Sequence, residues 1–240
     1  MLRLQRSAIG DKRMNDSTRK VWLITGAAGA LGSALVKPVM AGGADCIALD
    51  RQSGALDALH DELQERHGRA PALMPMDLAG AGPDDYQRLA EAVEAEFGRI
   101  DVLVHNAATF QALRPMLQQQ PGEWLEIVQT SLTAPYMLTA VLSPLMTADS
   151  TIVFVNDGHC LDHPGGWGAF GVAQAGRRQM VKTLQADRAR NGARVIGVDP
   201  GPFYSRLRVA VWPSDSPEHL PGADSAAEKV IAAVEQSEHS

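Results

Sequence analysis

The chain has 240 residues, of which 45% are hydrophobic and 21% are charged, a composition that excludes a chain disordered throughout. Its formal net charge of −6 argues against a protein that binds nucleic acid. The two cysteines, Cys46 and Cys160, make no disulfide framework, which favours a reducing compartment such as the cytoplasm.

The N-terminal segment is basic. Residues 1–20 carry six lysines and arginines against two aspartates, and they contain no continuous apolar stretch. We therefore expect residues 1–19 to form a disordered tail, not a secretory signal, ahead of a single domain over residues 20–240. Met1 and Met14 are both candidate translation starts, and the sequence does not decide between them.

Short apolar runs alternate with amphipathic segments along the rest of the chain. The runs have almost no polar alternation, as expected for parallel strands that are buried on both faces. Their order predicts an α/β fold, a single doubly wound Rossmann domain with a parallel sheet of about six strands flanked by helices. The expected strands are residues 21–24, 46–49, 72–74, 102–104, 152–155 and 195–198.

The segments between these strands have helical spacing of apolar residues. The clearest helix begins at Pro83 and ends before Gly98, residues that are typical of a helix start and a helix end. An uncharged window over residues 127–148 contains prolines and hydroxyl residues, so it fits a buried helix better than a membrane span. Further helices are expected over residues 52–68, 167–190 and 224–235.

A glycine-rich turn follows the first expected strand and leads into a helix. A turn of small residues lets a backbone approach a ligand closely, and a helix N-terminus offers free N–H groups to a pyrophosphate. The alternative interpretation is a tight turn that binds nothing. The candidate binding residues here are Thr25, Gly26, Gly29, Ala30, Leu31 and Gly32.

The ends of the other strands carry further candidates, because ligands of such sheets lie at the carboxyl ends of the strands. Asp50 follows Gly32 by 18 residues, which fits an acid that binds the adenosine ribose of NAD. Arg51 keeps NADP possible, since a guanidinium pairs with a 2′-phosphate. Asp50 is alternatively a helix N-cap for residues 52–68. The other candidates are Asp77, Leu78, Asn106, Ala107, Pro200 and Gly201.

Residues 200–222 interrupt the alternation of strands and helices. This stretch contains five prolines together with Phe203, Tyr204 and Trp212. We interpret it as a lid over the carboxyl edge of the sheet, and its aromatic residues hint at an apolar small-molecule ligand. A packed surface loop is the alternative.

On these residues the chain resembles the short-chain dehydrogenase/reductase family over roughly residues 20–235. The carrying motifs are TGAAGALG (25–32), the acid at 50, the Asp-Leu pair at 77–78, HNAA (105–108) and DPG (199–201). The resemblance implies that they bind the pyrophosphate, ribose, adenine ring and nicotinamide side of an NAD(P) cofactor. Ala30 departs from the usual middle glycine but is still small. The family's seventh strand has no counterpart here, which puts the usual tetramer in doubt.

The family transfers hydride with the help of an asparagine, a serine, a tyrosine and a lysine. Aligning WGAFGVAQ (167–174) with its Y-x-x-x-K helix puts Phe170 at the tyrosine and Gln174 at the lysine. Asp157 then falls at the serine and Ser131 at the asparagine. The resemblance therefore implies that the whole tetrad is replaced. Phenylalanine has no hydroxyl to move a proton, and neutral glutamine cannot lower a phenol pKa.

Other side chains are candidate substitutes. Asp157, His159 and His163 lie together after the fifth expected strand, and histidine is the usual proton carrier near neutral pH. Tyr204 offers a hydroxyl. The plainer interpretation is that each is a solvated loop residue.

Three other side chains in this region are expected to have no catalytic role, and no metal site is expected because no further ligands follow at known spacing. Cys160 has no placed base, so we interpret it as a small packing residue. Arg177 and Arg178 are expected to face solvent or a subunit interface.

Two main functional hypotheses follow. The first is a dinucleotide-binding member of the family with impaired hydride transfer, acting as a sensor, a scaffold or the silent partner of an active homologue. The second is an active NAD(P)-dependent oxidoreductase or a non-redox enzyme that uses Asp157, His159 or His163. A third, a structural subunit without cofactor, is disfavoured by Gly26 and Gly32. A homodimer or a heteromer through residues 127–148 and 167–190 is expected.

Overall fold

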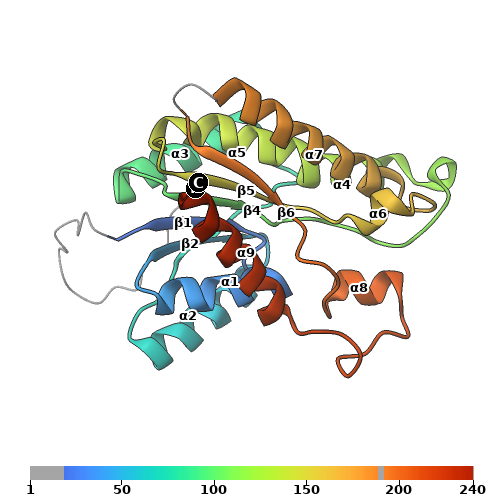
Figure 1. The fold of residues 1–240 in the computed structure, drawn as a ribbon, viewed down its shortest axis with the longest axis horizontal. Coiled ribbons are helices and arrows are strands. Elements are labelled where there is room, and N and C mark those ends of the chain that lie inside the picture. The colour runs from blue at the N-terminus through green and yellow to red at the C-terminus, as the bar shows by residue number, and fades with distance from the viewer. Residues whose placement is uncertain (1–18, 189–191, 240) are drawn as a thin grey trace.

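The computed structural model describes residues 19–188 and 192–239. The predicted N-terminal tail therefore lies outside the described residues, except for its last residue. The described chain forms one six-stranded, wholly parallel sheet with helices on both faces (Figure 1). The predicted α/β fold is confirmed.

The six strands occur where the apolar runs predict them, each with bounds within one or two residues of the prediction. Their spatial order is β3-β2-β1-β4-β5-β6, so the chain reverses direction across the sheet between β1 and β4. A switch point of this kind leaves a crevice at the carboxyl ends of the central strands. The strands are β1 (Val21–Thr25), β2 (Asp45–Asp50), β3 (Ala72–Pro75), β4 (Val102–His105), β5 (Thr151–Val155) and β6 (Arg194–Val198).

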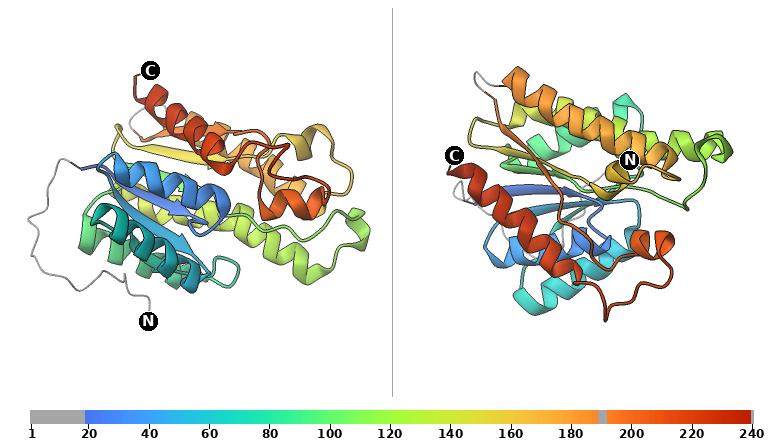
Figure 2. Two further views of the ribbon diagram at one scale, coloured as in Figure 1. Left: turned by 90° about the horizontal axis from the view of Figure 1, so that it is seen from below. Right: turned by 45° about the vertical axis from the view of Figure 1, so that its right-hand side comes forward.

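Two hydrophobic clusters fill the space between the sheet and the helices. One cluster packs α1 (Ala30–Ala41), α2 (Ser53–His67) and α9 (Ala223–Glu238) against one face of the sheet. The other packs α3 (Pro83–Phe97), α5 (Ala134–Leu142) and α7 (Gly168–Arg188) against the opposite face. Figures 1 and 2 show this three-layer arrangement, with α6 (His159–Asp162) and α8 (Arg206–Val211) beyond one end of the sheet.

The predicted limits of α3 are confirmed. Pro83 is its first residue, and the carboxylate of Asp85 accepts the backbone N–H of the N-cap residue Gly82 at 2.9 Å. At the other end Gly98 has a φ of 71°, a left-handed conformation that glycine adopts without strain.

The helix predicted over 127–148 differs from the structure at both ends. The helical segment begins with α4 (Pro121–Val128), continues through a π-helical turn (Gln129–Thr133) into α5, and ends in a 3-10 turn (Ser143–Leu145). The prediction missed the first turns because α4 contains two glutamates, which an uncharged window excludes. Proline at the first position of α4 is the local start signal.

Residues 199–222 leave the end of β6 and run past the carboxyl edge of the sheet before α9 begins. The sequence predicted an irregular stretch, whereas the structure contains the short helix α8 within it. The hydroxyl of Ser205 caps this helix by accepting the backbone N–H of Arg208 at 3.1 Å. Within the described chain, no helix is both long and apolar enough to cross a membrane.

Candidate cofactor cleft and the predicted catalytic positions

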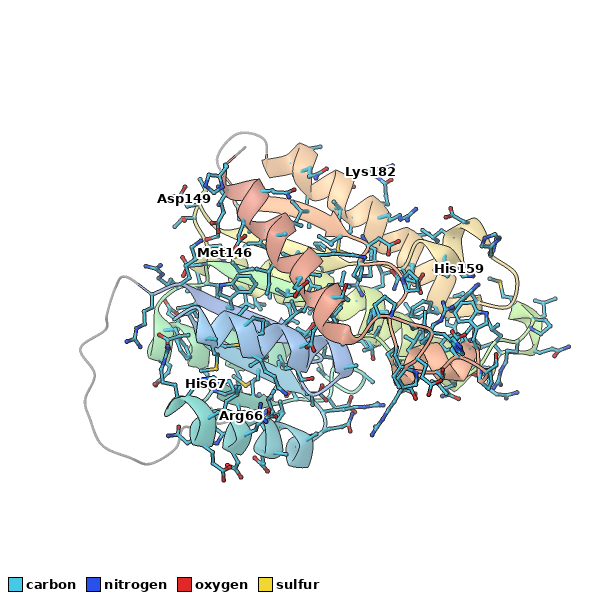
Figure 3. All side chains as sticks on the ribbon, turned by 60° about the horizontal axis from the view of Figure 1, so that its bottom comes forward. Arg66, His67, Met146, Asp149, His159 and Lys182 are labelled. Atoms are coloured by element: carbon cyan, nitrogen blue, oxygen red, sulfur yellow. The ribbon has the colours of Figure 1, made fainter. Side chains whose placement is uncertain are left out.

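A cleft of about 1070 Å³ opens at the carboxyl ends of the strands. Its wall combines the glycine-rich turn after β1, the residues that follow β2 to β6, the start of α7 and the segment with α8. Figure 3 shows His159 at this end of the molecule, whereas Met146 and Asp149 lie at the opposite edge of the sheet. The topology therefore concentrates the predicted site residues at one edge.

The glycine-rich turn approaches the cleft with bare backbone. A Cβ atom at position 32 would overlap the carbonyl oxygen of Gly26, and Gly26 itself has a φ of 67°. Both positions therefore require glycine. The helix α1 has no side-chain cap at Gly29, and Ala30 and Leu31 line the cleft, so the first N–H groups of the helix are available to an anion.

Thr25 and Asn106 join the ends of β1 and β4. The Thr25 hydroxyl accepts the backbone N–H groups of Asn106 and Ala107, each at 3.0 Å. The side-chain amide of Asn106 donates to the carbonyls of Thr25 at 3.0 Å and Gly26 at 3.2 Å. Thr25 is buried and does not line the cleft, so its contribution is to hold the turn in place, whereas Asn106 and Ala107 line the cleft directly.

Asp50 joins the turn to the end of β2. Its carboxylate accepts the backbone N–H of Ala28 and that of Gln52, each at 3.0 Å. The alternative interpretation of Asp50 as the N-cap of α2 is wrong, because the N-cap residue is Gln52. Asp50 is buried yet lines the cleft beside Arg51, whose guanidinium pairs with Glu126 of α4 at 3.1 Å.

The remaining predicted cofactor residues also line the cleft. Asp77 and Leu78 follow β3, and Pro200 and Gly201 follow β6. Lys229 of α9 donates to the carbonyl of Pro200 at 2.7 Å and so ties this turn to the helix behind it.

The positions predicted to replace the catalytic groups are close to one another. Phe170 and Gln174 line the cleft from α7 and are almost completely buried. The side-chain oxygen of Gln174 accepts the backbone N–H of Asp157 at 3.1 Å. Phe170 packs with Phe110 and Trp167, at ring-centroid distances of 5.5 and 5.6 Å. The site therefore presents an aromatic ring and a neutral amide where the family's tyrosine and lysine are expected.

Ser131 lies inside the π-helical turn between α4 and α5. It is fully buried, its hydroxyl has no hydrogen-bond partner among the described residues, and it does not line the cleft. A π-helical turn within a helix is frequently found at functional sites.

Asp157 lines the cleft together with Phe170 and Gln174. Its carboxylate accepts the backbone N–H of His159 at 2.9 Å at the start of α6. The pKa of Asp157 is raised, mainly by burial of its carboxyl. The nearby Asp199 carboxylate also raises this pKa, whereas the hydrogen bonds from Cys160 and His159 lower it. Burial also raises the pKa of the Cys160 thiol to about 12, so this cysteine is protonated at neutral pH, a poor nucleophile.

The candidate substitutes separate in space. His159 lines the cleft, and its ring lies 4.7 Å from that of His163 and 5.0 Å from that of Trp212. His163 and Tyr204 do not line the cleft, so the structure does not bring these two to the site. Among the described residues no group of three or more His, Cys, Asp or Glu side chains is arranged to hold a metal ion.

Arg177 corrects the prediction that both arginines of α7 face solvent. Both arginines line the cleft, but Arg178 is exposed whereas Arg177 has no exposed area. Its guanidinium donates to the carbonyl of His105 and, at 3.5 Å, to that of Ala107. The available signal was helical spacing, since position 177 lies on the same face of α7 as Phe170 and Gln174. The prediction followed residue type instead of this spacing, because arginine is seldom fully buried.

Sequence and structure comparisons agree with this architecture. The profile of the short chain dehydrogenase family matches residues 20–215. The uncharacterized oxidoreductase YciK of Escherichia coli K12 is 27% identical over 203 residues, which cover 84% of this chain and 80% of the relative.

Two similar solved structures are short chain dehydrogenases with bound nucleotides. One, from Shigella flexneri 2a and complexed with NADP, has a TM-score of 0.81 at 26% identity and covers 88% of this chain and 87% of its own. The other, from Escherichia coli CFT073 and complexed with NADPH, has a TM-score of 0.82 at 25% identity and covers 92% and 90%. The chain belongs to the short chain dehydrogenase family.

Proposed function

We propose that this protein binds NAD or NADP in the cleft and does not transfer hydride by the tyrosine–lysine route of its family. The observation that carries the proposal is the bond between Gln174 and Asp157 beside the buried ring of Phe170. No hydroxyl and no lysine are present there to move and stabilise a proton. Loss of a positioned general acid typically lowers the rate about 10²–10⁴-fold.

The residues present fit a dinucleotide. Gly26 and Gly32 keep the turn bare, and the uncapped start of α1 suits a pyrophosphate. Asp50 lines the cleft after β2, which supports a role at the ribose, and the solved relatives complexed with NADP and NADPH support the binding of a dinucleotide. When bound, the nicotinamide would supply or accept hydride, and the residues of this chain would bind and orient it.

Such a protein would act as a dinucleotide sensor, a scaffold or the silent partner of an active homologue. We propose that residues 200–222 act as a lid, because Trp212 on this segment packs against the rings of His159 and Trp167 across the cleft. Two free, buried cysteines fit a reducing compartment such as the cytoplasm.

The test is a calorimetric titration of the full chain with NAD⁺, NADH, NADP⁺ and NADPH. The Ala30→Glu variant puts a carboxylate at the first turn of α1, where it stabilises the helix but repels a pyrophosphate. We expect it to abolish binding with an unchanged or higher melting temperature, while the neutral Ala30→Gln variant keeps binding. The absence of binding by all four nucleotides to the wild type would contradict the proposal.

One observation favours a second candidate, an enzyme that uses Asp157 as its proton carrier. Burial raises the pKa of this carboxyl, and Asp157 lines the cleft near Phe170 and Gln174. A raised pKa suits a general acid. Turnover of a panel of carbonyl compounds by the wild type, lost in Asp157→Asn, would establish this candidate in place of the first.

A further inference from the structure

We propose that the buried charge of Arg177 makes the cleft bind the reduced, uncharged nicotinamide ring in preference to the oxidised, cationic ring. The inference rests on the proposed binding of a nicotinamide dinucleotide. It concerns a residue of α7 that belongs to none of the expected cofactor or catalytic positions.

Arg177 is an unusual cation. Its side chain has no exposed area, and no carboxylate of the described chain pairs with it. Burial lowers its pKa to about 10, so the guanidinium remains positively charged at neutral pH. Two backbone carbonyls accept from its Nη atoms, but its Nε has no partner among the described residues. A buried cation without a counter-ion is costly, and its field is poorly screened.

The position of this charge is set by the direction of α7. Helical side chains lean toward the N-terminus of their helix, and α7 begins at the cleft. An arginine more than two turns into α7 therefore brings its guanidinium back to the end of β4, at the carbonyls of His105 and Ala107. His105 cannot share the charge, since burial lowers its pKa well below the usual range, as does Arg177.

The end of β4 belongs to the half of the cleft beyond the pyrophosphate. In sheets of this order the two halves of a dinucleotide bind on either side of the switch point, here between β1 and β4. With the adenosine half over β2 and β3, where Asp50 lies, the nicotinamide half lies over β4, β5 and β6. Arg177 therefore shares its half of the cleft with the nicotinamide ring.

The charge of that ring depends on its oxidation state, positive in NAD⁺ and neutral in NADH. A fixed cation nearby disfavours binding of the cationic ring of NAD⁺ and leaves binding of the neutral ring of NADH unaffected. Two carboxylates, Asp157 and Asp199, also line this half and act in the opposite sense. However, Asp199 is exposed and Asp157 half-buried, so water and salt screen their fields more than that of the enclosed Arg177. Arg178, the next residue of α7, also lines the cleft, but it is exposed, so its field is screened in the same way. Exposed Lys182, farther along α7, does not line the cleft and is the control.

The experiment is a calorimetric titration of the full chain with NAD⁺, NADH and ADP. We expect the wild type to bind NADH more tightly than NAD⁺, on the order of tenfold, and Arg177→Met to bring this ratio close to one. Arg177→Lys keeps the charge and should keep most of the ratio, and Lys182→Met should leave it unchanged. The affinity for ADP, which lacks the nicotinamide half, should change by less than about twofold in each folded variant.

The outcomes separate this inference from the proposed function. If neither nucleotide binds the wild type, the proposed function fails. If both bind and Arg177→Met leaves their ratio unchanged, or lowers the affinity for ADP as much as that for NADH, only the inference about Arg177 is overturned. If Arg177→Met does not fold, equal wild-type affinities for NAD⁺ and NADH contradict the inference by themselves.

Discussion

The side-chain oxygen of Gln174 accepts the backbone N–H of Asp157 at 3.1 Å, so two of the expected catalytic positions are bonded to each other. The amide at the position predicted for the family's lysine thus holds the loop after β5. This contact uses the oxygen as an acceptor, a role that a lysine ammonium cannot fill. The glutamine at position 174 therefore suits the conformation of its neighbour.

Restoring the family's residues should restore carbonyl reduction if dinucleotide binding is intact. The Phe170→Tyr/Gln174→Lys double variant adds a hydroxyl and a cation that lowers its pKa. We expect its NADPH- or NADH-dependent turnover of a carbonyl panel to exceed that of the wild type by about tenfold or more. Phe170→Tyr alone should gain less, because its phenol lacks the cation. A wild type as active as the double variant would refute this expectation.

Asp157 should make stability depend on pH. Because burial raises the pKa of its folded-state carboxyl, the folded protein holds this proton more tightly than the unfolded chain does. Its contribution to stability is therefore fully present below the unfolded pKa of about 3.9 and is lost as pH rises through the raised folded value. Asp157→Asn should increase the free energy of unfolding at pH 7 by less than about 1 kcal/mol, since the side chain is partly exposed.

Urea denaturation of both proteins from pH 4 to pH 8 measures this effect. The advantage of the variant should shrink as the pH falls toward 4, because the protonated fraction of the wild-type carboxyl rises in both states. A difference that is constant across this range would show that the substitution acts through the hydrogen bond to His159 instead.

Glu126 should influence the choice between NAD and NADP. It pairs with Arg51 at 3.1 Å and so competes with a 2′-phosphate for that guanidinium. In Glu126→Gln we expect several-fold tighter binding of NADPH and a change of less than about twofold for NADH, by calorimetry. Glu62→Gln, which breaks ion pairs to Lys37 and Arg66 away from the cleft, is the control. Equal effects on both nucleotides would exclude this role.

The subunit interface expected over residues 127–148 and 167–190 can be tested on α5 and α7. Tyr136 and Val172 lie on these helices with 58% and 41% of their surface exposed. If they form a dimer interface, Tyr136→Asp should convert the dimer to a monomer in light scattering, because it buries a charge. Leu117→Asp alters a fully exposed apolar residue outside these helices and should leave the mass unchanged. A monomeric wild type at micromolar concentration would contradict the expected interface.

The strands of the sheet could be predicted from the sequence, because strands that are buried on both faces are continuous apolar runs. The glycine-rich turn could be predicted too, because the backbone at positions 26 and 32 allows only glycine, as Gly26 and Gly32 show. The Asp50 carboxylate also lies at the predicted edge, although its hydrogen bonds to Ala28 and Gln52 depend on tertiary contacts that no local pattern encodes.

The site was less predictable where side-chain direction decides. His159 faces the cleft while His163, one turn later, does not, and a loop sequence carries no periodicity to distinguish them. Arg177 was assigned to the surface by residue type, although its helical spacing put it with Phe170 and Gln174. Long-range hydrogen bonds to the end of β4 hold it inside.

The aromatic contacts of Trp212 give the protein an internal optical reporter. Its ring lies 5.9 Å from that of Trp167 and under the guanidinium of Arg208, at 3.6 Å. Indole emission responds to the polarity around the ring, so separation of the 200–222 segment from α7 would expose both indoles and shift their fluorescence to longer wavelength. The position of this segment can therefore be followed in solution, without a label, as nucleotide is added.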